Sequence, residues 1–436
     1  MIENKSIWRQ TAGKPQFSTL ERDIKTDVLI VGGGIAGVLC LYQLKKSGVD
    51  AILVEGKEIC SGVTGNTTAK LTVQHGLIYE KIIKKYGRNE ARLYFQAQNS
   101  ALEEYIRLCA SIECDFEEKS SYVYSRDDYQ SICREYDALR SIGCKADLIT
   151  QAPLPFSISG AVEIKNQAQF NPLKFLYKLA EKLPIYENTK VIELRDNIAL
   201  TNRGKIRFKK AIIATHFPFI NKYGAYFMKM YQHRSYVLAL EGAPDVNGMY
   251  IDEKMGGLSF RNHNGLLVFG GGSHRTGKNG GSWEELEQLA SLYYPRAKIV
   301  ARWAAQDCMT LDGMPYVGQY SSKLADIYVA TGFSKWGMTS SMAAAMILTD
   351  LVIGKRNEFS RVFKPQRSIW HPQLVINAAE SFINLVTPTT PRCSHMGCAL
   401  KYNKQEHTWD CPCHGSRFSE NGEIIDNPAT DDKKNM

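Results

Sequence analysis

The sequence predicts a mixed α/β (α+β) protein in three parts. These are a Rossmann-like dinucleotide-binding domain, an inserted domain on an antiparallel sheet, and a small all-β subdomain at the C-terminus that holds a metal. Three observations predict them: a glycine-rich turn after an apolar run near the N-terminus, strand-like runs alternating with turns in the middle, and cysteines gathered with histidines near the end. A chain of 436 residues has room for two or three domains.

Composition indicates a globular protein, with 44% hydrophobic and 23% charged residues. The net charge is +9, but basic and acidic residues are interspersed, so we expect a solvated surface and no nucleic-acid partner. The longest apolar run, 342–353, is shorter than the roughly 18 residues of a membrane span, and residues 1–16 lack the apolar stretch of a signal peptide. We expect a cytoplasmic protein without a transmembrane segment and leave peripheral membrane association open.

The N-terminal part carries the pattern of a dinucleotide-binding unit. An apolar, β-branched run at 27–31 is followed by a glycine-rich turn and by a helical pattern through Lys46. A second strand pattern at 51–54 ends on Glu55, about 20 residues after the glycines, as in the dinucleotide fingerprint. Because strand, turn, helix, second strand and acid occur in order, the pattern indicates a cofactor site.

Each position of this turn has a chemical reason. Gly32 permits the tight turn, Gly34 lets the backbone approach a pyrophosphate, and Gly37 lets the helix pack close to the strand. The phosphates would lie at the helix N-terminus, where free N–H groups meet their charge, while Glu55 would accept hydrogen bonds from a ribose. The hydroxyl-rich stretch 61–70 would wrap a long cofactor, although its composition also suits a plain polar loop.

Later landmarks point to one family of flavoproteins. Strand patterns end at 212–216 and 329–333, and an Asp-Gly-Met-Pro motif lies at 312–315. With the glycine turn, these features make residues 25–355 resemble the D-amino-acid oxidase-like flavoproteins, which include glycine oxidase and sarcosine oxidase. The resemblance implies an FAD-binding domain with extended FAD and a separate antiparallel sheet over the isoalloxazine ring. The residues expected at FAD are Gly32, Gly34, Gly37, Glu55, Ser61, Thr64, Thr68, Ala214, Thr215, Gly332, Lys335, Gly337, Met338 and Thr339.

The FAD-binding domain is expected to be discontinuous, because the strand-rich substrate domain interrupts it. The expected boundaries are 1–75, 171–221 and 306–365 for the FAD-binding domain, 76–170 and 222–305 for the substrate domain, 366–391 for a linker, and 392–436 for the C-terminal subdomain.

The C-terminal segment offers two ligand boxes. Cys393 and His395 form a Cys-x-His box, and Cys411 and His414 form a Cys-x-x-His box. Two thiolates and two imidazoles suit a [2Fe-2S] cluster, with the cysteines on one iron and the histidines on the other. The same four side chains also satisfy tetrahedral Zn²⁺, but the glycines and proline around the boxes are not needed for zinc.

Both boxes closely resemble those of Rieske proteins, including the Rieske proteins of the cytochrome bc complexes. The resemblance implies that the four box residues bind the cluster and that Cys398 and Cys413 form a disulfide, although a reducing cytoplasm would favour thiols. Only 368–392 separates the first box from the flavoprotein, so we expect a shortened Rieske subdomain resting directly on it. Phe418 stands where tyrosine is usual, so we expect fewer donors to the cluster and a lower reduction potential, although Ser416 can still donate.

The combination predicts an oxidoreductase. A flavin takes a hydride from a C–H bond next to nitrogen or oxygen, and a cluster passes electrons onward singly. We expect a dehydrogenase of a small amine, amino acid or hydroxy acid, with a protein or quinone as one-electron acceptor. The alternatives are a relay between protein or quinone partners without a small substrate, and a regulatory protein that senses redox state or iron.

The expected substrate contacts are Asp307 and Arg234. In the amino-acid oxidases, an arginine before the Asp-x-x-Pro motif grips the substrate carboxylate. Counting back from Asp312, that position is Asp307, which would repel a carboxylate. We therefore expect a cationic or hydroxyl group there, or a carboxylate held elsewhere by Arg234. The alternative for Asp307 is a structural ion pair with Arg302.

Overall fold

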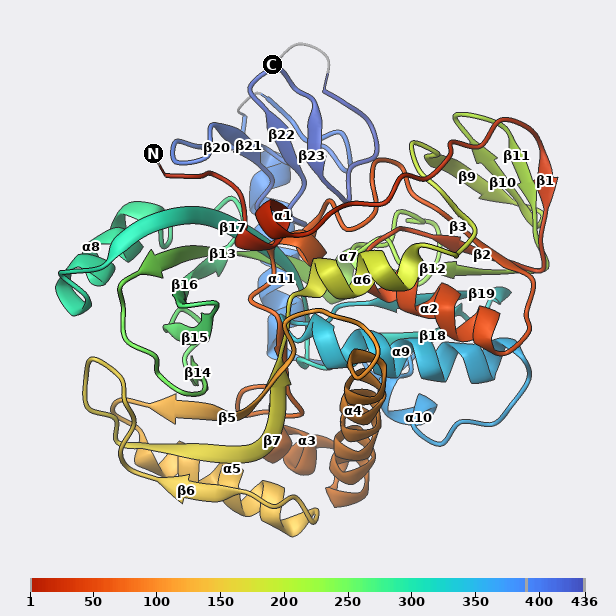
Figure 1. Cartoon of the computed structure of the whole chain (residues 1–436). Helices are drawn as coiled ribbons and strands as arrows, with labels where there is room; N and C mark the ends of the chain where they lie inside the picture. The colour runs from red at the N-terminus through yellow and green to blue at the C-terminus, as the bar shows by residue number, and fades with distance from the viewer. Residues whose placement is uncertain (1, 389–390, 434–436) are drawn as a thin grey trace.

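The structure, a computed structural model of the chain, describes residues 2–388 and 391–433. It consists of a dinucleotide-binding domain, a large sheet with its helices, and a small C-terminal sheet at the top of the view (Figure 1). The predicted mixed α/β architecture is confirmed. Within the two described ranges, no helix is long and apolar enough to cross a lipid bilayer.

A six-stranded sheet forms the centre of the dinucleotide-binding domain. β2 lies between β3 and β12, and β8 and β19 extend this parallel sheet on either side. β18 pairs with β19 in antiparallel fashion at the edge. The strands are β2 (Val28–Val31), β3 (Ala51–Val54), β8 (Ile185–Tyr186), β12 (Lys210–Ile213), β18 (Tyr316–Ser321) and β19 (Leu324–Thr331).

The central strands are apolar on both faces because both faces are covered. Val28 and Ile30 of β2 point into a core shared with α2 and α9. Leu29 and Val31 point into a second core, shared with a small four-stranded sheet. Strands buried on both faces read as continuous apolar runs, which explains why the sequence shows them clearly. The covering elements are α2 (Ile35–Lys46), α9 (Gly337–Val352), β1 (Ile24–Lys25), β11 (Lys205–Arg207), β10 (Ile198–Thr201) and β9 (Val191–Arg195).

The large sheet has the order β17, β13, β16, β15, β14, β5, β7, β4, with β6 paired to β7. Neighbours are antiparallel except β14 and β5, which run parallel. The boundary expected between 305 and 306 falls inside β17, which leads toward the dinucleotide-binding domain. The strands are β4 (Lys70–Leu71), β5 (Glu117–Ser125), β6 (Asp147–Ile149), β7 (Gly160–Gln169), β13 (Met230–Glu241), β14 (Met249–Asp252), β15 (Ser259–His263), β16 (Leu266–Arg275) and β17 (Lys298–Thr310). The helices beside this sheet are α3 (Tyr79–Tyr86), α4 (Arg88–Cys109), α5 (Tyr129–Ser141) and α8 (Trp283–Tyr293).

The C-terminal sheet contains four short antiparallel strands. Residues 366–391, expected as a linker, contain the 15-residue helix α11. The C-terminal strands are β20 (Lys401–Asn403), β21 (Thr408–Asp410), β22 (Arg417–Ser419) and β23 (Ile424–Asp426). The other helices are α1 (Ile7–Thr11), the 3-10 helix η1 (Val63–Asn66), α6 (Pro172–Ala180), α7 (Tyr226–Lys229), α10 (Ser360–Phe363) and α11 (Pro372–Val386).

Candidate active site and metal centre

The glycine turn lies at the end of β2, beside a cavity of about 380 Å³. Gly32 has a φ of +109°, and a Cβ there would lie 2.6 Å from the carbonyl oxygen of Ala214. A Cβ on Gly37 would lie 1.9 Å from the carbonyl oxygen of Gly32. Neither position accepts a side chain, so the turn keeps its backbone open toward the cavity, as a bound pyrophosphate requires.

Glu55 is held beside the turn by backbone donors. Its carboxylate accepts hydrogen bonds from the N–H groups of Gly33 at 2.7 Å and Lys57 at 2.8 Å. Burial raises the pKa of Glu55, and these two donors oppose that shift. Thr64 accepts a bond of 3.0 Å from the N–H of Ile35, in the first turn of α2. The acid and the hydroxyl-rich stretch thus meet at one helix N-terminus.

The residues expected at FAD fall into three groups: those that line the first cavity, one that lines a second cavity, and those that line neither. Thr68 lines a second, adjacent cavity, whereas Gly37, Gly332 and Thr339 line neither cavity. Gly332 has a φ of +70°, and a Cβ there would lie 2.3 Å from the Thr310 side chain. Thr339 donates a hydrogen bond of 2.9 Å to the carbonyl of Thr72. The first cavity is lined by Gly32, Gly34, Glu55, Ser61, Thr64, Ala214, Thr215, Lys335, Gly337 and Met338.

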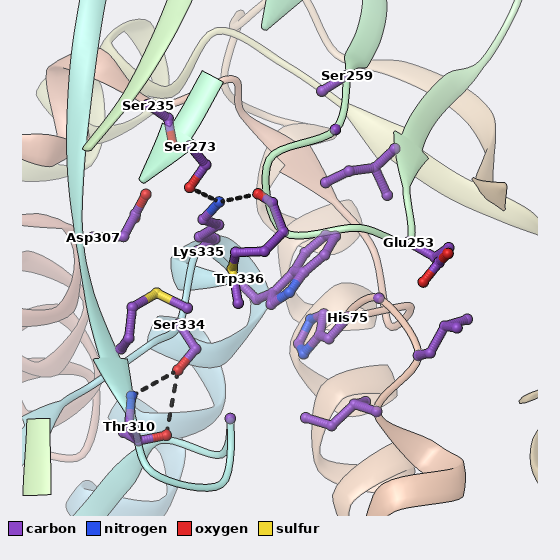
Figure 2. Close-up of a pocket in the computed structure, with 18 of the residues that line it drawn as sticks. His75, Ser235, Glu253, Ser259, Ser273, Asp307, Thr310, Ser334, Lys335 and Trp336 are labelled. Carbon is purple, nitrogen blue, oxygen red and sulfur yellow. Dashed lines mark hydrogen bonds between the residues drawn. The ribbon is translucent and has the colours of Figure 1, made fainter. Parts of the chain in front are cut away.

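The second cavity has a volume of about 650 Å³ and lies against strands of the large sheet (Figure 2). The two cavities adjoin, because the same side chains line both. This arrangement suits a long cofactor in the first cavity with a small molecule in the second. The shared residues are Val63, Thr67, Asp307, Ser334, Lys335 and Met338.

Lys335 and Asp307 are the charged residues at this junction. Figure 2 shows Lys335 pointing toward Ser273, to which its Nζ donates at 2.5 Å; it also donates to the carbonyl of Met255 at 3.3 Å. Burial lowers the pKa of Lys335 to about 8, and Asp307 opposes the shift. Burial also raises the pKa of Asp307. Arg302 pairs with Glu287 at 3.0 Å, so it is not the partner of Asp307.

Arg234, which we expected to hold a substrate carboxylate, is instead paired with another residue. It lines neither cavity. Its Nε donates to Oε1 of Glu406 at 2.7 Å, and its Nη2 donates to the other carboxylate oxygen. Because Glu406 belongs to the C-terminal subdomain, Arg234 joins that subdomain to β13. It is not available to hold a substrate carboxylate.

Three residues of the second cavity were not among the expected site residues, although Lys70 ends the stretch 61–70 and Trp336 lies between the expected residues Lys335 and Gly337. Lys70 is buried and donates to Ser259 Oγ at 2.6 Å; burial lowers its pKa to about 7. The His75 ring stacks on Trp336, with ring centroids 5.0 Å apart, and the two rings face each other in Figure 2. Burial lowers the pKa of His75 to about 3, so the ring is neutral. Of the three, His75 is the residue that no local pattern in the sequence indicates.

The two ligand boxes meet at the base of the C-terminal sheet. The expected disulfide between Cys398 and Cys413 is present and ties the two loops together. The sulfur of Cys411 lies within 4.8 Å of both disulfide sulfurs. Cys393 and Cys411 are free thiols, both buried. With one cysteine pair closed as a disulfide, this second pair remains free to supply sulfur ligands.

The two histidines fit a metal cluster. The His395 and His414 rings are 5.0 Å apart between centroids. Both Nδ1 atoms are buried, and neither has a hydrogen-bond partner among the described residues. Nε2 of His395 is bonded to the amide oxygen of Asn221 at 3.0 Å, which leaves Nδ1 as the free lone pair. Buried nitrogen atoms without partners are costly unless they bind something, and a metal satisfies them.

The cluster loops rest directly on the flavoprotein. Gln232 of β13 donates to the carbonyl of His414 at 2.9 Å, and Gln306 of β17 donates to the carbonyl of Gly415 at 2.8 Å. A Cβ on Gly415 would lie 2.5 Å from the Gln232 side chain, so the approach is close. Ile424 to Asn427, Ala429 and Thr430 also line the dinucleotide cavity. The metal centre and the cofactor cavity are therefore neighbours.

Comparison with known proteins agrees with this geometry. The family model described as "FAD dependent oxidoreductase" matches residues 27–351, and the model "Rieske [2Fe-2S] domain" matches 353–436. The chain is 35% identical to YhfW of Bacillus subtilis (strain 168), named as a Rieske 2Fe-2S iron-sulfur protein, over 97% of this chain and 96% of the relative.

More distant similarities cover the flavoprotein part. Gamma-glutamylputrescine oxidoreductase of Escherichia coli (strain K12) is 22% identical, over 79% of this chain and 87% of the relative. The crystal structure of glycine oxidase from Geobacillus kaustophilus superposes with a TM-score of 0.66 at 21% identity, covering 79% of this chain and 100% of that chain. At this identity, the superposition establishes the fold alone.

Proposed function

Since the chain belongs to the FAD dependent oxidoreductase family and ends in a Rieske [2Fe-2S] domain, we propose that it is a dehydrogenase whose cluster carries the electrons away from the flavin. The proposed substrate is a small amine, amino acid or hydroxy acid. Bound FAD supplies a hydride acceptor, and the cluster supplies a one-electron carrier. The acceptor that follows is a protein or a quinone.

The observation that carries the proposal is the contact between the two sites. Thr215 and His216 line the cofactor cavity, and the next residue, Phe217, lies beside both box histidines. Its ring centroid is 6.5 Å from that of His395 and 6.4 Å from that of His414. A single short segment therefore touches both centres. An oxidase that gives electrons directly to oxygen would need no cluster in this position.

The second cavity favours a small substrate over a relay without one. Its volume of about 650 Å³ falls within the usual range of roughly 300–1,000 Å³ for small-molecule sites. Lys335 and Asp307 place opposite charges at its junction with the cofactor cavity. Such a pair can orient a polar substrate and hold a proton at the Asp307 carboxylate, whose pKa is raised by burial.

Asp307→Asn should slow substrate-driven flavin reduction by about 100-fold, because an amide neither takes a proton nor attracts a cationic group. A panel of amines, amino acids and hydroxy acids, tested without oxygen by bleaching of the flavin absorbance, identifies the substrate and measures this rate. Asp326→Asn, at an exposed position on β19, is the matched control. Rapid reduction by glycine or D-alanine that Asp307→Asn leaves unchanged would rule out this role.

The purified protein should contain FAD and two irons per chain, and either His395→Ala or His414→Ala should remove the iron without removing FAD. The reason is that neither histidine lines the cofactor cavity. Metal analysis and the flavin absorbance measure both contents. His407→Ala, an exposed histidine of the same subdomain, should leave both unchanged. Zinc instead of iron after anaerobic purification would contradict the assignment.

A further inference from the structure

Helix α11 buries its polar side and exposes its apolar side to solvent. Its buried residues are polar: Asn377 accepts a hydrogen bond of 2.8 Å from Arg275, and the carbonyl of Asn384 accepts one of 2.9 Å from the N–H of Ala399. Its outward residues are apolar, with Val375 70% exposed and Phe382 67% exposed. At 3.6 residues per turn, the exposed apolar side chains cover about half of the circumference. A surface helix normally shows the opposite arrangement.

The exposed apolar side chains of α11 follow helical spacing and share one side of the helix; together with Trp370, just before the helix, they make up what we call the α11 face. The helix contains a single charged residue, Glu380, and that residue pairs with Lys278 at 2.6 Å. Trp370, just before the helix, is 84% exposed. Isolated exposed apolar residues are ordinary, but a group of them on one side of a helix marks an interaction site. The α11 face consists of Trp370, Val375, Ile376, Phe382, Ile383, Leu385 and Val386.

Basic groups lie near both ends of α11, and one lies alongside it. At the N-terminal end, Lys81 and Lys85 line the second cavity together with His371, whose pKa is lowered by burial and by the nearby charge of Lys85. Lys278 lies alongside the helix through its pair with Glu380. At the C-terminal end, Arg392 donates to the carbonyl of Leu385 at 2.9 Å. An uncharged face with cations at its rim complements a surface that is apolar inside and anionic outside.

We propose that the α11 face docks on an anionic lipid bilayer, with the helix lying in the plane of the interface. At 15 residues, α11 is shorter than the roughly 20 needed to span the hydrocarbon core. Tryptophan and phenylalanine beside basic residues are typical of interfacial helices. A second copy of the chain would instead bring like charges of the two rims together.

Docking in this orientation would bring the metal centre close to the membrane. The sulfur of Cys413, which is part of the disulfide, lies 4.0 Å from the carbonyl oxygen of Glu380, so α11 contacts the cluster loops directly. If the proposed function is correct, this position would let the cluster pass electrons to an acceptor in the bilayer. The docking itself does not depend on the reaction, so it can fail or succeed independently.

Flotation of the full-length protein, loaded with both cofactors, tests the proposal. The protein should float with vesicles of phosphatidylglycerol and phosphatidylcholine, and less with phosphatidylcholine alone. The triple variant Val375→Ser, Phe382→Ser, Val386→Ser should bind about tenfold or more weakly, because it removes three apolar side chains from the interface. Leu292→Ser on α8, where an equally exposed leucine lies outside the face, is the matched control.

Retained FAD and iron show that the triple variant is folded, since its changes lie on the solvent side of the helix. Absence of flotation by the wild-type protein, or equal flotation by the triple variant, would overturn the proposal. So would a stable dimer in sedimentation that the triple variant converts to a monomer, because the face would then belong to a second copy.

Discussion

Replacing Glu406 with glutamine should weaken the attachment of the C-terminal subdomain by about 3–5 kcal/mol, as expected when one partner of a buried ion pair loses its charge. Glu406 lies between Arg234, from β13, and Arg417, from β22; the second pair measures 2.8 Å. All three side chains are less than 10% exposed. Arg417 keeps Asp410 and Asp426 as partners, whereas Arg234 keeps no acidic partner among the described residues.

Denaturant unfolding, followed separately by the cluster and flavin absorbance, measures this effect. In the variant, the cluster signal should be lost at a lower denaturant concentration than in the wild-type protein. Glu420→Gln, an exposed acid of the same subdomain, should leave the midpoint unchanged. An unchanged midpoint for Glu406→Gln would mean that the ion pairs do not hold the subdomain in place.

The same residue predicts a pH dependence. Burial raises the pKa of Glu406, but Arg234 and Arg417 outweigh this and bring the pKa down to about 2. An unfolded glutamate titrates near pH 4.3. The stabilisation is therefore fully present above about pH 4.3 and is lost as the pH falls toward 2. Glu406→Gln should lack this component of the acid dependence, which unfolding midpoints across this pH range would show.

Local patterns predicted the two cofactor centres well. The glycine turn, α2, β3 and Glu55 lie within one short segment, so their spacing alone indicates how they meet. The two ligand boxes are equally local, and the disulfide between Cys398 and Cys413 follows the resemblance that their spacing carries. In both cases the chemistry requires particular residue types at fixed distances along the chain.

Contacts between distant segments were not predictable in this way. Arg234 was expected at the substrate. Its actual partner, Glu406, lies 172 residues later, and no local pattern in the sequence indicates that the two meet. His75 and the C-terminal residues from Ile424 onward reach the cavities only because the fold brings distant segments together. The pattern of α11 is misleading in itself, because apolar residues at helical spacing normally indicate the face that packs inward.

The most direct test of the account measures electron transfer with and without the cluster. With the substrate that the panel identifies, and with cytochrome c as a one-electron acceptor, His414→Ala should leave flavin reduction close to the wild-type rate. Transfer to cytochrome c should fall by about 100-fold, because the cluster that carries single electrons is missing. His407→Ala should match the wild-type protein in both steps. Equal cytochrome c turnover in a His414→Ala variant that keeps its fold and FAD would show that the cluster only stabilises the C-terminus, and would contradict the proposed function.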